Sequence, residues 1–211
     1  SHTGSLTGQD EVYNAAFEKA GVIRVRTLEE LFDLTLALTN QPVPPGEEVV
    51  IITNGGGAGI IATDACELYN VKLLDVPSYP DLVNKFSTCM PDFGSYKNPV
   101  DLTGQAGKEG YKRAIEYALE DENVHGIIAL YCHTALTDPI EIAEAIHEAV
   151  EKANANKPIV VSLIGGEEVS AAINWLRERG IAAYPTPEKA VFAMSGLMRR
   201  KRFLDRVKRE E

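Results

Sequence analysis

Apolar residues along this chain change their spacing at regular intervals, from short continuous runs to stretches with helical periodicity. No polar residue interrupts residues 49–52 (VVII) or 127–130 (IIAL), which predicts strands that are buried on both faces. Between such runs, apolar residues recur three and four positions apart, which predicts helices with one buried face. This alternation of strand and helix is typical of a parallel sheet covered by helices on both sides.

Residues 47–198 carry the alternation and are predicted to form one α/β domain. Its expected strands are residues 49–52, 71–74, 125–131, 159–163 and 181–183, and its expected helices are residues 58–69, 80–88, 108–120, 139–152, 167–179 and one that starts at Pro187. The best fit is a doubly wound, flavodoxin-like parallel sheet of about five strands. Ligands of such sheets bind at the loops that follow the carboxyl ends of the strands.

A smaller unit precedes this domain, over residues 1–40. It comprises an expected helix over residues 10–20, a short strand over residues 22–25 and a second helix from Leu28, where Thr27 and Glu30 form a capping box. This helix–strand–helix unit is too small to bury its own apolar faces, so we expect it to be the C-terminal remnant of a second α/β domain. Residues 41–46 contain three prolines and are predicted to be a linker.

Composition and charge describe a soluble globular chain. Of its 211 residues, 45% are hydrophobic and 25% are charged, which excludes disordered and collagen-like classes. The net charge of −10 argues against nucleic acid and anionic membranes as partners. Residues 199–211 are the exception, with seven basic and three acidic side chains. This basic helix end is either solvated, with its cations complementing the helix dipole, or a subunit-docking segment.

Cysteine usage and the lack of targeting signals predict a cytoplasmic protein. The three cysteines, Cys66, Cys89 and Cys132, are odd in number and widely spaced, so we expect neither a disulfide framework nor a metal site. No apolar stretch approaches the roughly 18 residues of a membrane span. The start of the chain lacks the basic and apolar regions of an export signal.

Three loops at the expected carboxyl edge of the sheet are candidate binding sites. Their candidate residues are Asn54, Gly55, Gly56 and Gly57 in the first loop, Thr134, Ala135, Thr137 and Asp138 in the second, and Gly165 and Gly166 in the third. The first loop lacks the last glycine of a dinucleotide fingerprint and has no GK[ST] motif. Its glycines permit close backbone approach to a ligand, and free amides at a helix start attract anions. Tight packing between strand and helix is the alternative explanation for each loop.

Four histidines occur in the chain, and one of them is a candidate nucleophile. His125 and His147 fall in predicted elements and are interpreted as structural, while His133 is ambiguous. His2 lies among small polar residues, where a side chain can move between sites. A neutral imidazole, with a pKa of about 6.5, is a competent nucleophile toward phosphorus. A Ser-His pair at a chain start is also what an expression tag leaves behind.

Several motifs together carry a resemblance to a known family. They are SHTGSLTG at residues 1–8, the helix of residues 10–20 with its following Gly-Val, TNGGG at residues 53–57, NPVDLTG at residues 98–104, and Gly165-Gly166. The chain resembles, over essentially its whole length, the α subunit of ADP-forming (NDP-forming) acyl-CoA synthetases, in the succinyl-CoA synthetase superfamily.

The resemblance implies an acid–thiol ligase that interconverts acyl-CoA, ADP and phosphate with carboxylate, CoA and ATP. It passes through an acyl phosphate and a phosphorylated histidine, which by resemblance is His2. The implied partners are an ATP-grasp β subunit or domain, an upstream CoA-binding Rossmann domain and a small carboxylic acid or acyl-CoA. No cofactor is expected in this chain itself, since CoA and Mg-ADP or Mg-ATP would be bound by the other domains or the other subunit. We expect the isolated chain to be inactive.

Phosphate binding in this chain would have to depend on helix starts. The loops around residues 54–59 and 133–138 contain no lysine or arginine, while a phosphohistidine carries close to two negative charges. We expect the helix start at Thr134 to Asp138 to cradle phosphate, and Asn54 to Gly57 to contact the acyl or carboxylate group. The alternative function is a non-catalytic, ligand-sensing module of a regulatory protein such as a fused acetyltransferase.

Overall fold

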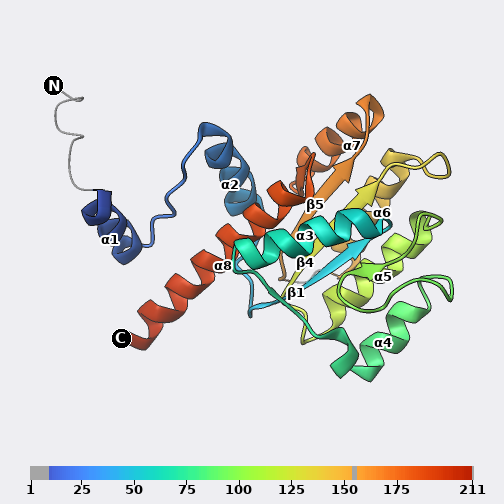
Figure 1. The fold of residues 1–211 in the computed structure, drawn as a ribbon, viewed down its shortest axis with the longest axis horizontal. Helices are drawn as coiled ribbons and strands as arrows, with labels where there is room; N and C mark the ends of the chain where they lie inside the picture. The colour runs from blue at the N-terminus through green and yellow to red at the C-terminus, as the bar shows by residue number, and fades with distance from the viewer. Residues whose placement is uncertain (1–9, 154–155, 211) are drawn as a thin grey trace.

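The computed structural model describes residues 10–153 and 156–210, which form an α/β structure (Figure 1). Its strands are β1 (Glu48–Thr53), β2 (Lys72–Leu73), β3 (Val100–Asp101), β4 (Gly126–Cys132), β5 (Ile159–Ile164) and β6 (Ala182–Tyr184). Its helices are α1 (Asp10–Ala20), α2 (Leu28–Asn40), α3 (Gly56–Leu68), α4 (Pro80–Ser87), α5 (Lys108–Glu120), α6 (Pro139–Ala153), α7 (Glu167–Arg177) and α8 (Pro187–Glu210), with one 3-10 turn at Val76–Ser78.

The strands form one parallel sheet in the order β2-β1-β4-β5-β6, which confirms the predicted doubly wound, flavodoxin-like fold. The two-residue β3 also pairs with β1, beyond the end of β2. The sheet therefore has six strands where about five were expected. The strand β3 was not predicted, because the residues around it, NPVDLTG at 98–104, contain no continuous apolar run.

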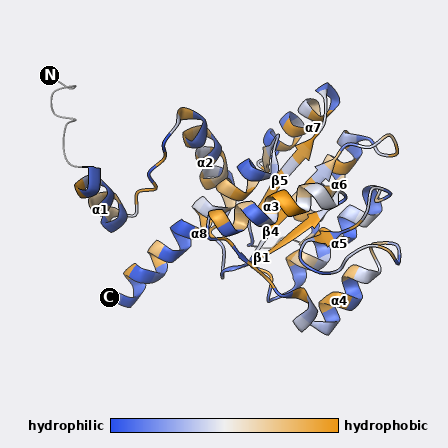
Figure 2. Cartoon of the chain, in the orientation of Figure 1, coloured by the Kyte–Doolittle hydropathy of each residue, from blue (hydrophilic) through white to orange (hydrophobic). Residues whose placement is uncertain are grey.

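Alternate side chains of β1 face two separate cores, which explains its uninterrupted apolar sequence. Val50 and Ile52 belong to the core that also holds buried residues of α4, α5, α6 and α7, while Val49 and Ile51 belong to the core formed with α3 and α8. All four side chains are fully buried, and each contributes about 1.5–3 kcal/mol to stability by leaving water. Figure 2 shows β1 in orange, among helices that carry both blue and orange residues.

The Asn98 side chain fills the space between β2 and β3 along the edge of β1. Its Oδ1 accepts a hydrogen bond from the Ile51 amide at 3.0 Å. Its Nδ2 donates to the carbonyls of Val49 and Leu74, at 2.8 and 3.1 Å. The side-chain amide thus stands in for a strand residue, and the edge of β1 stays hydrogen-bonded along its length.

The expected strand at residues 22–25 is wrong, although α1 and α2 form as predicted. This stretch pairs with no strand in the part of the chain that the structure describes. Without a neighbouring strand its backbone cannot form a ladder. Its apolar side chains Ile23 and Val25 instead line a groove with Leu31 of α2 and Leu197 of α8.

Candidate functional site

The parallel sheet brings the three predicted loops to one edge. The first loop follows β1, the second follows β4 and the third follows β5. Cys132 and Ile164, the last residues of β4 and β5, are paired, so these two strands end at the same level. His2, the expected phosphorylated residue, lies outside the described residues.

Asn54 joins the ends of β1 and β4. Its Oδ1 accepts from the Cys132 amide at 2.7 Å, and its Nδ2 donates to the Cys132 carbonyl at 2.9 Å. Only 4% of Asn54 is exposed. Because both ends of the amide are occupied, a ligand at this loop would meet the backbone of the glycines that follow.

The start of α3 is an open, uncapped helix N-terminus. Gly55 is the N-cap, with no side-chain hydrogen bond to the helix, and the first turn contains no acidic residue. A Cβ atom on Gly55 would lie 2.7 Å from the Cys132 Sγ, so only glycine fits there. A Cβ on Gly57 would meet nothing within 4 Å. Amides at an exposed helix start attract anions through unpaired N–H groups and the helix dipole.

Asp101 lies beside this helix start and was missed by the site prediction. Its Oδ1 accepts from the Thr103 amide at 2.9 Å, which fixes the carboxylate in a tight turn. Its Oδ2 lies 3.1 Å from where a Cβ on Gly56 would stand. The signal was present in the NPVDLTG motif, but the pairing of β3 with β1 that brings Asp101 to the glycines was not predicted.

Cys132 is half-buried against the same glycine loop and is not a nucleophile there. Burial raises the pKa of its thiol, and the nearby Asp101 carboxylate raises it further. A thiol needs its thiolate form to attack a substrate. At neutral pH Cys132 therefore stays protonated and acts as a packing residue beneath Gly55.

The loop between β4 and α6 satisfies most of its polar groups internally. The Thr137 hydroxyl lies 2.8 Å from the Tyr131 hydroxyl and 3.2 Å from that of Thr134. Asp138 Oδ1 accepts from the Ile140 amide at 2.7 Å, so a carboxylate already occupies the start of α6. Ala135 lines a shallow hollow beside this start, of about 580 Å³, that also borders Glu168.

Close packing explains why Gly165, in the third loop, is a glycine. A Cβ on Gly165 would lie 2.5 Å from the Val169 Cγ2 and 2.9 Å from the His133 Cβ. Gly166 is the N-cap of α7 and makes no side-chain cap, but Glu167 and Glu168 stand in the first turn. This helix start therefore already carries negative charge.

The chain matches two known domain families. Residues 49–207 match the Ligase-CoA domain, and residues 1–38 match the succinyl-CoA ligase like flavodoxin domain. The chain belongs to the Ligase-CoA domain family. This confirms the resemblance to ADP-forming acyl-CoA synthetases.

Individual relatives of this Ligase-CoA chain are ADP-forming synthetases. It is 50% identical to the alpha subunit of ADP-forming acetate–CoA ligase I of Pyrococcus furiosus, over 93% of this chain and 42% of that subunit. It is 40% identical to ADP-forming acetate–CoA ligase of Methanocaldococcus jannaschii, over 93% of this chain and 28% of the relative. The chain thus spans less than half the length of these relatives.

A solved structure shares the fold over the whole chain. The dinucleotide forming acetyl-coenzyme A synthetase 1 of Ca. Korarchaeum cryptofilum, in complex with phosphate and ADP, superposes with a TM-score of 0.93 at 38% identity. The match covers 99% of this chain and 45% of that chain. The placement of the N-terminal helices on the Ligase-CoA sheet is therefore shared with a relative.

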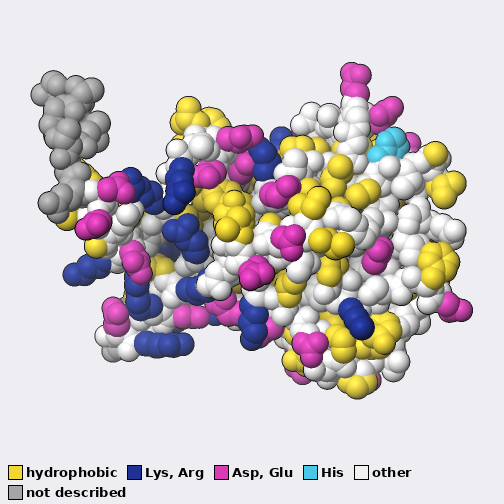
Figure 3. Space-filling model, viewed as in Figure 1, with side chains coloured by type: hydrophobic (Ala, Val, Ile, Leu, Met, Phe, Trp, Pro, Cys, Tyr) yellow, Lys and Arg dark blue, Asp and Glu magenta, His cyan; other side chains and the backbone are white. Residues whose placement is uncertain are grey.

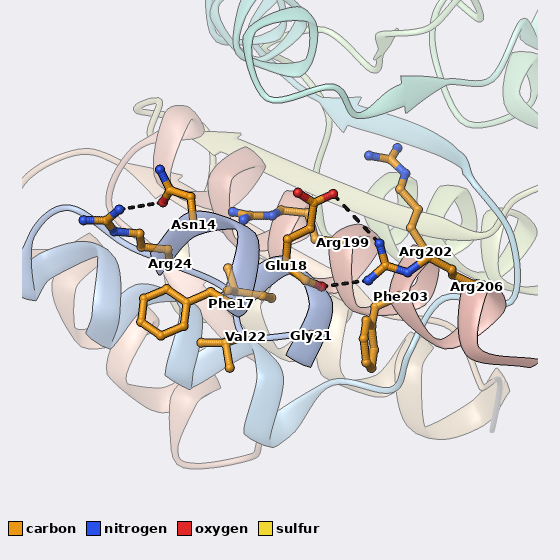
Figure 4. Close-up of a pocket in the computed structure, with 11 residues that line it drawn as sticks. Asn14, Phe17, Glu18, Gly21, Val22, Arg24, Arg199, Arg202, Phe203 and Arg206 are labelled. Atoms are coloured by element: carbon orange, nitrogen blue, oxygen red, sulfur yellow. Dashed lines mark hydrogen bonds and ion pairs between the residues drawn. The ribbon is translucent and has the colours of Figure 1, made fainter. Parts of the chain in front are cut away.

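Basic side chains gather at the other end of the Ligase-CoA chain, over α1 and the C-terminal half of α8 (Figure 3). A pocket of about 410 Å³ lies between these two helices (Figure 4). Arg206 Nη2 donates to the Glu18 carbonyl at 2.7 Å, and Arg202 donates to Glu47 Oε2 from both Nε and Nη2, at 3.0 and 2.6 Å. Part of the predicted basic segment 199–211 thus holds α1 against α8.

Within residues 10–153 and 156–210, no group of three or more His, Cys, Asp or Glu side chains is placed to hold a metal ion. None of the helices over the same residues is long and apolar enough to cross a membrane.

Proposed function

We propose that this chain is part of an ADP-forming acyl-CoA synthetase, with acetyl-CoA as the expected substrate class. It would interconvert acyl-CoA, ADP and phosphate with carboxylate, CoA and ATP. Support comes from the relatives, which are named as ADP-forming acetate–CoA ligases, and from the structural relative that was solved with phosphate and ADP. The relatives do not favour the regulatory-module alternative, since those reported above are named as ligases and synthetases.

The reaction divides into three displacements. A phosphate oxygen attacks the acyl carbon of the thioester, the C–S bond breaks and CoA leaves as the thiol after protonation. An imidazole nitrogen of His2 attacks the phosphorus of the acyl phosphate, whose P–O bond to the carboxyl oxygen breaks to release the carboxylate. A terminal oxygen of ADP then attacks the same phosphorus, the P–N bond breaks and ATP forms. CoA and the nucleotide would be held by domains or a partner subunit beyond this chain.

In this proposal the start of α3 stabilises the phosphoryl group. The observation that carries it is a difference between the three helix starts at the carboxyl edge. Asp138 caps α6 with a carboxylate, and Glu167 and Glu168 place two acidic side chains in the first turn of α7. The start of α3 has neither a side-chain cap nor an acidic first turn, and the space beside Gly57 is open. The Asp101 carboxylate lies beside Gly56, but it accepts from the Thr103 amide and, among the described residues, from no amide of α3. The N-terminus of a helix stabilises an exposed anion by about 0.3–1 kcal/mol and a partly buried anion by up to about 2 kcal/mol.

The proposed phosphate contact lies in the first loop, whereas the sequence placed it in the second loop. The sequence favoured residues Thr134 to Asp138, because a proline and a capping residue mark a helix start there. In the folded chain that cap is already bonded to the helix. Gly55, Gly56 and Gly57 would contact the phosphoryl group through their backbone, while Asn54 and Gly165 support the surrounding turns.

The proposal is tested with the complete synthetase that contains this chain. ATP formation would be followed from acetyl-CoA, ADP and inorganic phosphate. We expect activity that needs all three substrates and that His2→Ala abolishes. A matched control is His147→Ala, because His147 lies on the opposite core from α3, pairing with Glu151 and Trp175. Equal activity of the His2→Ala and unmodified enzymes would overturn the proposal.

A further inference from the structure

The pocket between α1 and α8 is lined by four arginines. They are Arg24, Arg199, Arg202 and Arg206, and Glu18 is the acidic side chain among the eleven lining residues. This positive charge lies on a chain whose net charge is −10. Like charges that lie close together repel each other, so such a cluster needs carboxylates or a bound anion to balance it.

Carboxylates balance two of the four arginines. Arg24 forms an ion pair with Asp10 of α1. Arg202 donates to Glu47 Oε2 from both Nε and Nη2, and it also donates to the carbonyl of Asn70 at 2.9 Å. The charges of these two guanidinium groups are therefore already paired within the chain.

The other two arginines form no hydrogen bond with a carboxylate of the described residues. Arg199 is exposed, and its side chain takes part in no hydrogen bond or ion pair within residues 10–153 and 156–210. Arg206 Nη2 donates to the neutral Glu18 carbonyl at 2.7 Å, while its Nη1 lies 3.9 Å from the Glu18 carboxylate. A distance of 3.9 Å is too long for a hydrogen bond. Arg199 and Arg206 therefore have charge and donors available for a ligand.

Arg199 and Arg206 lie on one side of α8. They are seven residues apart, which is close to two helical turns and a rise of about 10 Å. Both line the pocket, and Figure 4 shows them beside Glu18 of α1. Their long side chains can converge on a group that has negatively charged oxygens at both ends, and a guanidinium group binds phosphate oxygens in pairs. A diphosphate has this shape and charge.

The pocket has room for such a ligand. Its volume of about 410 Å³ falls in the range of small-molecule sites, roughly 300–1,000 Å³. Phe17 and Val22 add an apolar wall, which suits a ligand with an organic part. The Glu18 side chain is 80% exposed, so its carboxylate can turn toward solvent when an anion enters.

This pocket is separate from the proposed phosphate site. Arg202 lines the pocket and bonds to Asn70, just past the C-terminal end of α3. The proposed phosphate site is at the N-terminal end of α3, a helix of 13 residues that is about 20 Å long. An anion bound between α1 and α8 would therefore occupy a second site.

We propose that this pocket binds a diphosphate group, supplied by inorganic pyrophosphate or by a nucleotide. Arg199 and Arg206 hold its oxygens, and Arg24 faces it from the segment that follows α1. Helix α1, all of which the structure describes, has no buried residue, so the bound anion fastens this helix to α8. The site is an addition to the proposed function and does not depend on it.

Titration of the 211-residue chain with inorganic pyrophosphate tests the site, because the chain itself supplies every lining residue. Isothermal titration calorimetry at low salt should detect binding that weakens as salt screens the arginines. Arg199→Gln should lower the affinity at least about tenfold, because a charge-assisted pair of hydrogen bonds is lost. The exposed Arg199 side chain can be replaced without disturbing the fold. Absence of binding, or binding that Arg199→Gln leaves unchanged, would overturn the proposal.

Arg209→Gln is the matched control. Arg209 is an exposed arginine of the same helix, and it does not belong to the lining of the pocket. This variant loses the same charge and should keep the affinity of the unmodified chain within about twofold. A loss equal to that of Arg199→Gln would show that pyrophosphate responds to the overall charge of the helix end, and would overturn a site in the pocket.

The complete synthetase shows whether the pocket is accessible in the assembled enzyme. There, Arg199→Gln should remove one bound pyrophosphate per copy of this chain, whatever binds at the catalytic sites. The same number of bound pyrophosphates in the unmodified and Arg199→Gln enzymes would overturn the proposal.

Comparison with ADP and adenosine identifies the source of the diphosphate group. Tighter binding of ADP than of pyrophosphate would identify a nucleotide, because the adenosine part adds contacts with the apolar wall. Equal or weaker binding of ADP would identify inorganic diphosphate. Adenosine has no diphosphate group and should not bind, so adenosine binding as strong as that of ADP would overturn the proposal.

Amide hydrogen exchange tests the link between α1 and α8. Saturating pyrophosphate should slow the exchange of residues 10–20 in the unmodified chain, and the same concentration should have a smaller effect on Arg199→Gln. Helix α5 belongs to the opposite core and should exchange at the same rate with and without pyrophosphate. Unchanged exchange of α1 when pyrophosphate is bound would overturn the placement of the ligand between these two helices.

Discussion

Asn54 and Asn98 each use a side-chain amide where a neighbouring strand would supply backbone groups. Asn54 was expected to contact a ligand. Because both ends of its amide are occupied, that contact is now predicted for the glycines beside it. Its actual partner, Cys132, is 78 residues away in the sequence, so no local pattern reveals the pairing. Asn98 appeared only as part of a motif. Its bonds to three backbone groups depend on how β2 and β3 meet β1.

Replacing Asn54 with aspartate tests the structural role of this amide. A carboxylate can accept from the Cys132 amide but cannot donate to the Cys132 carbonyl. At pH 7 we expect Asn54→Asp to lower the free energy of unfolding by about 2–4 kcal/mol, because a buried carbonyl loses its donor and a charge is buried. Urea denaturation measures the change. The exposed Asn14→Asp, on α1, should stay within about 0.5 kcal/mol.

The loss of unfolding free energy caused by Asn54→Asp should become smaller as the pH falls. Burial raises the pKa of the new carboxyl in the folded state above its unfolded value near 3.9. The folded state then binds a proton more readily than the unfolded state, so lowering the pH toward 4 should reduce the difference from the unmodified protein. The protonated carboxyl can also donate to Cys132. A difference that grows as the pH falls would contradict this role.

At the scale of elements, periodicity predicted the fold and the positions of most helix starts, but not how each start is capped. Residues 108–120 form α5 at the expected bounds, because one apolar face and a following turn mark both ends. Residues 22–25 have the composition of a strand, but no strand within residues 10–153 and 156–210 pairs with them. The three helix starts at the carboxyl edge look alike in sequence. They differ in whether a carboxylate such as that of Asp138 folds back onto the amides.

Gly57→Asp should separate the stability of α3 from its proposed function. An acidic residue in the first turn of a helix favours the dipole, so the free energy of unfolding should rise by about 0.3–1 kcal/mol. The same carboxylate repels a phosphoryl group. Thermal denaturation and transfer of labelled phosphate to the chain would be measured on the same sample. Lower stability together with unchanged phosphate transfer would show that the start of α3 has been assigned wrongly.

At the scale of the whole molecule, the chain has an acidic body and a basic end. The net charge of −10 coexists with seven basic side chains in residues 199–211. Several of these residues are not simply solvated. Arg202 binds Glu47 next to β1, and Phe203 and Arg206 hold α1. Helix α1 is thus attached through the part of α8 that extends past the sheet, whereas α2 packs on the sheet domain itself, where Ala37 joins the core and the Tyr184 hydroxyl donates to the Asp33 carbonyl.

Removal of residues 199–211 should weaken assembly more than folding. The buried residues of α8 end at Met198, so the sheet domain keeps its core. We expect the free energy of unfolding to fall by no more than about 2 kcal/mol, from the lost Arg202 to Glu47 pair and its packing. The complex with the partner subunit should elute later on a sizing column. An unchanged elution volume would contradict a role for this segment in assembly.

Direct localisation of phosphate on the chain is the most decisive measurement. The complete synthetase would be incubated with γ-labelled ATP, digested at alkaline pH, where phosphohistidine survives, and its peptides sequenced by mass spectrometry. The expected result is acid-labile phosphate on His2, absent from His2→Ala and at least about tenfold reduced in Gly57→Asp. Equal labelling of the His2→Ala protein, or label at another residue, would contradict the mechanism proposed for this chain.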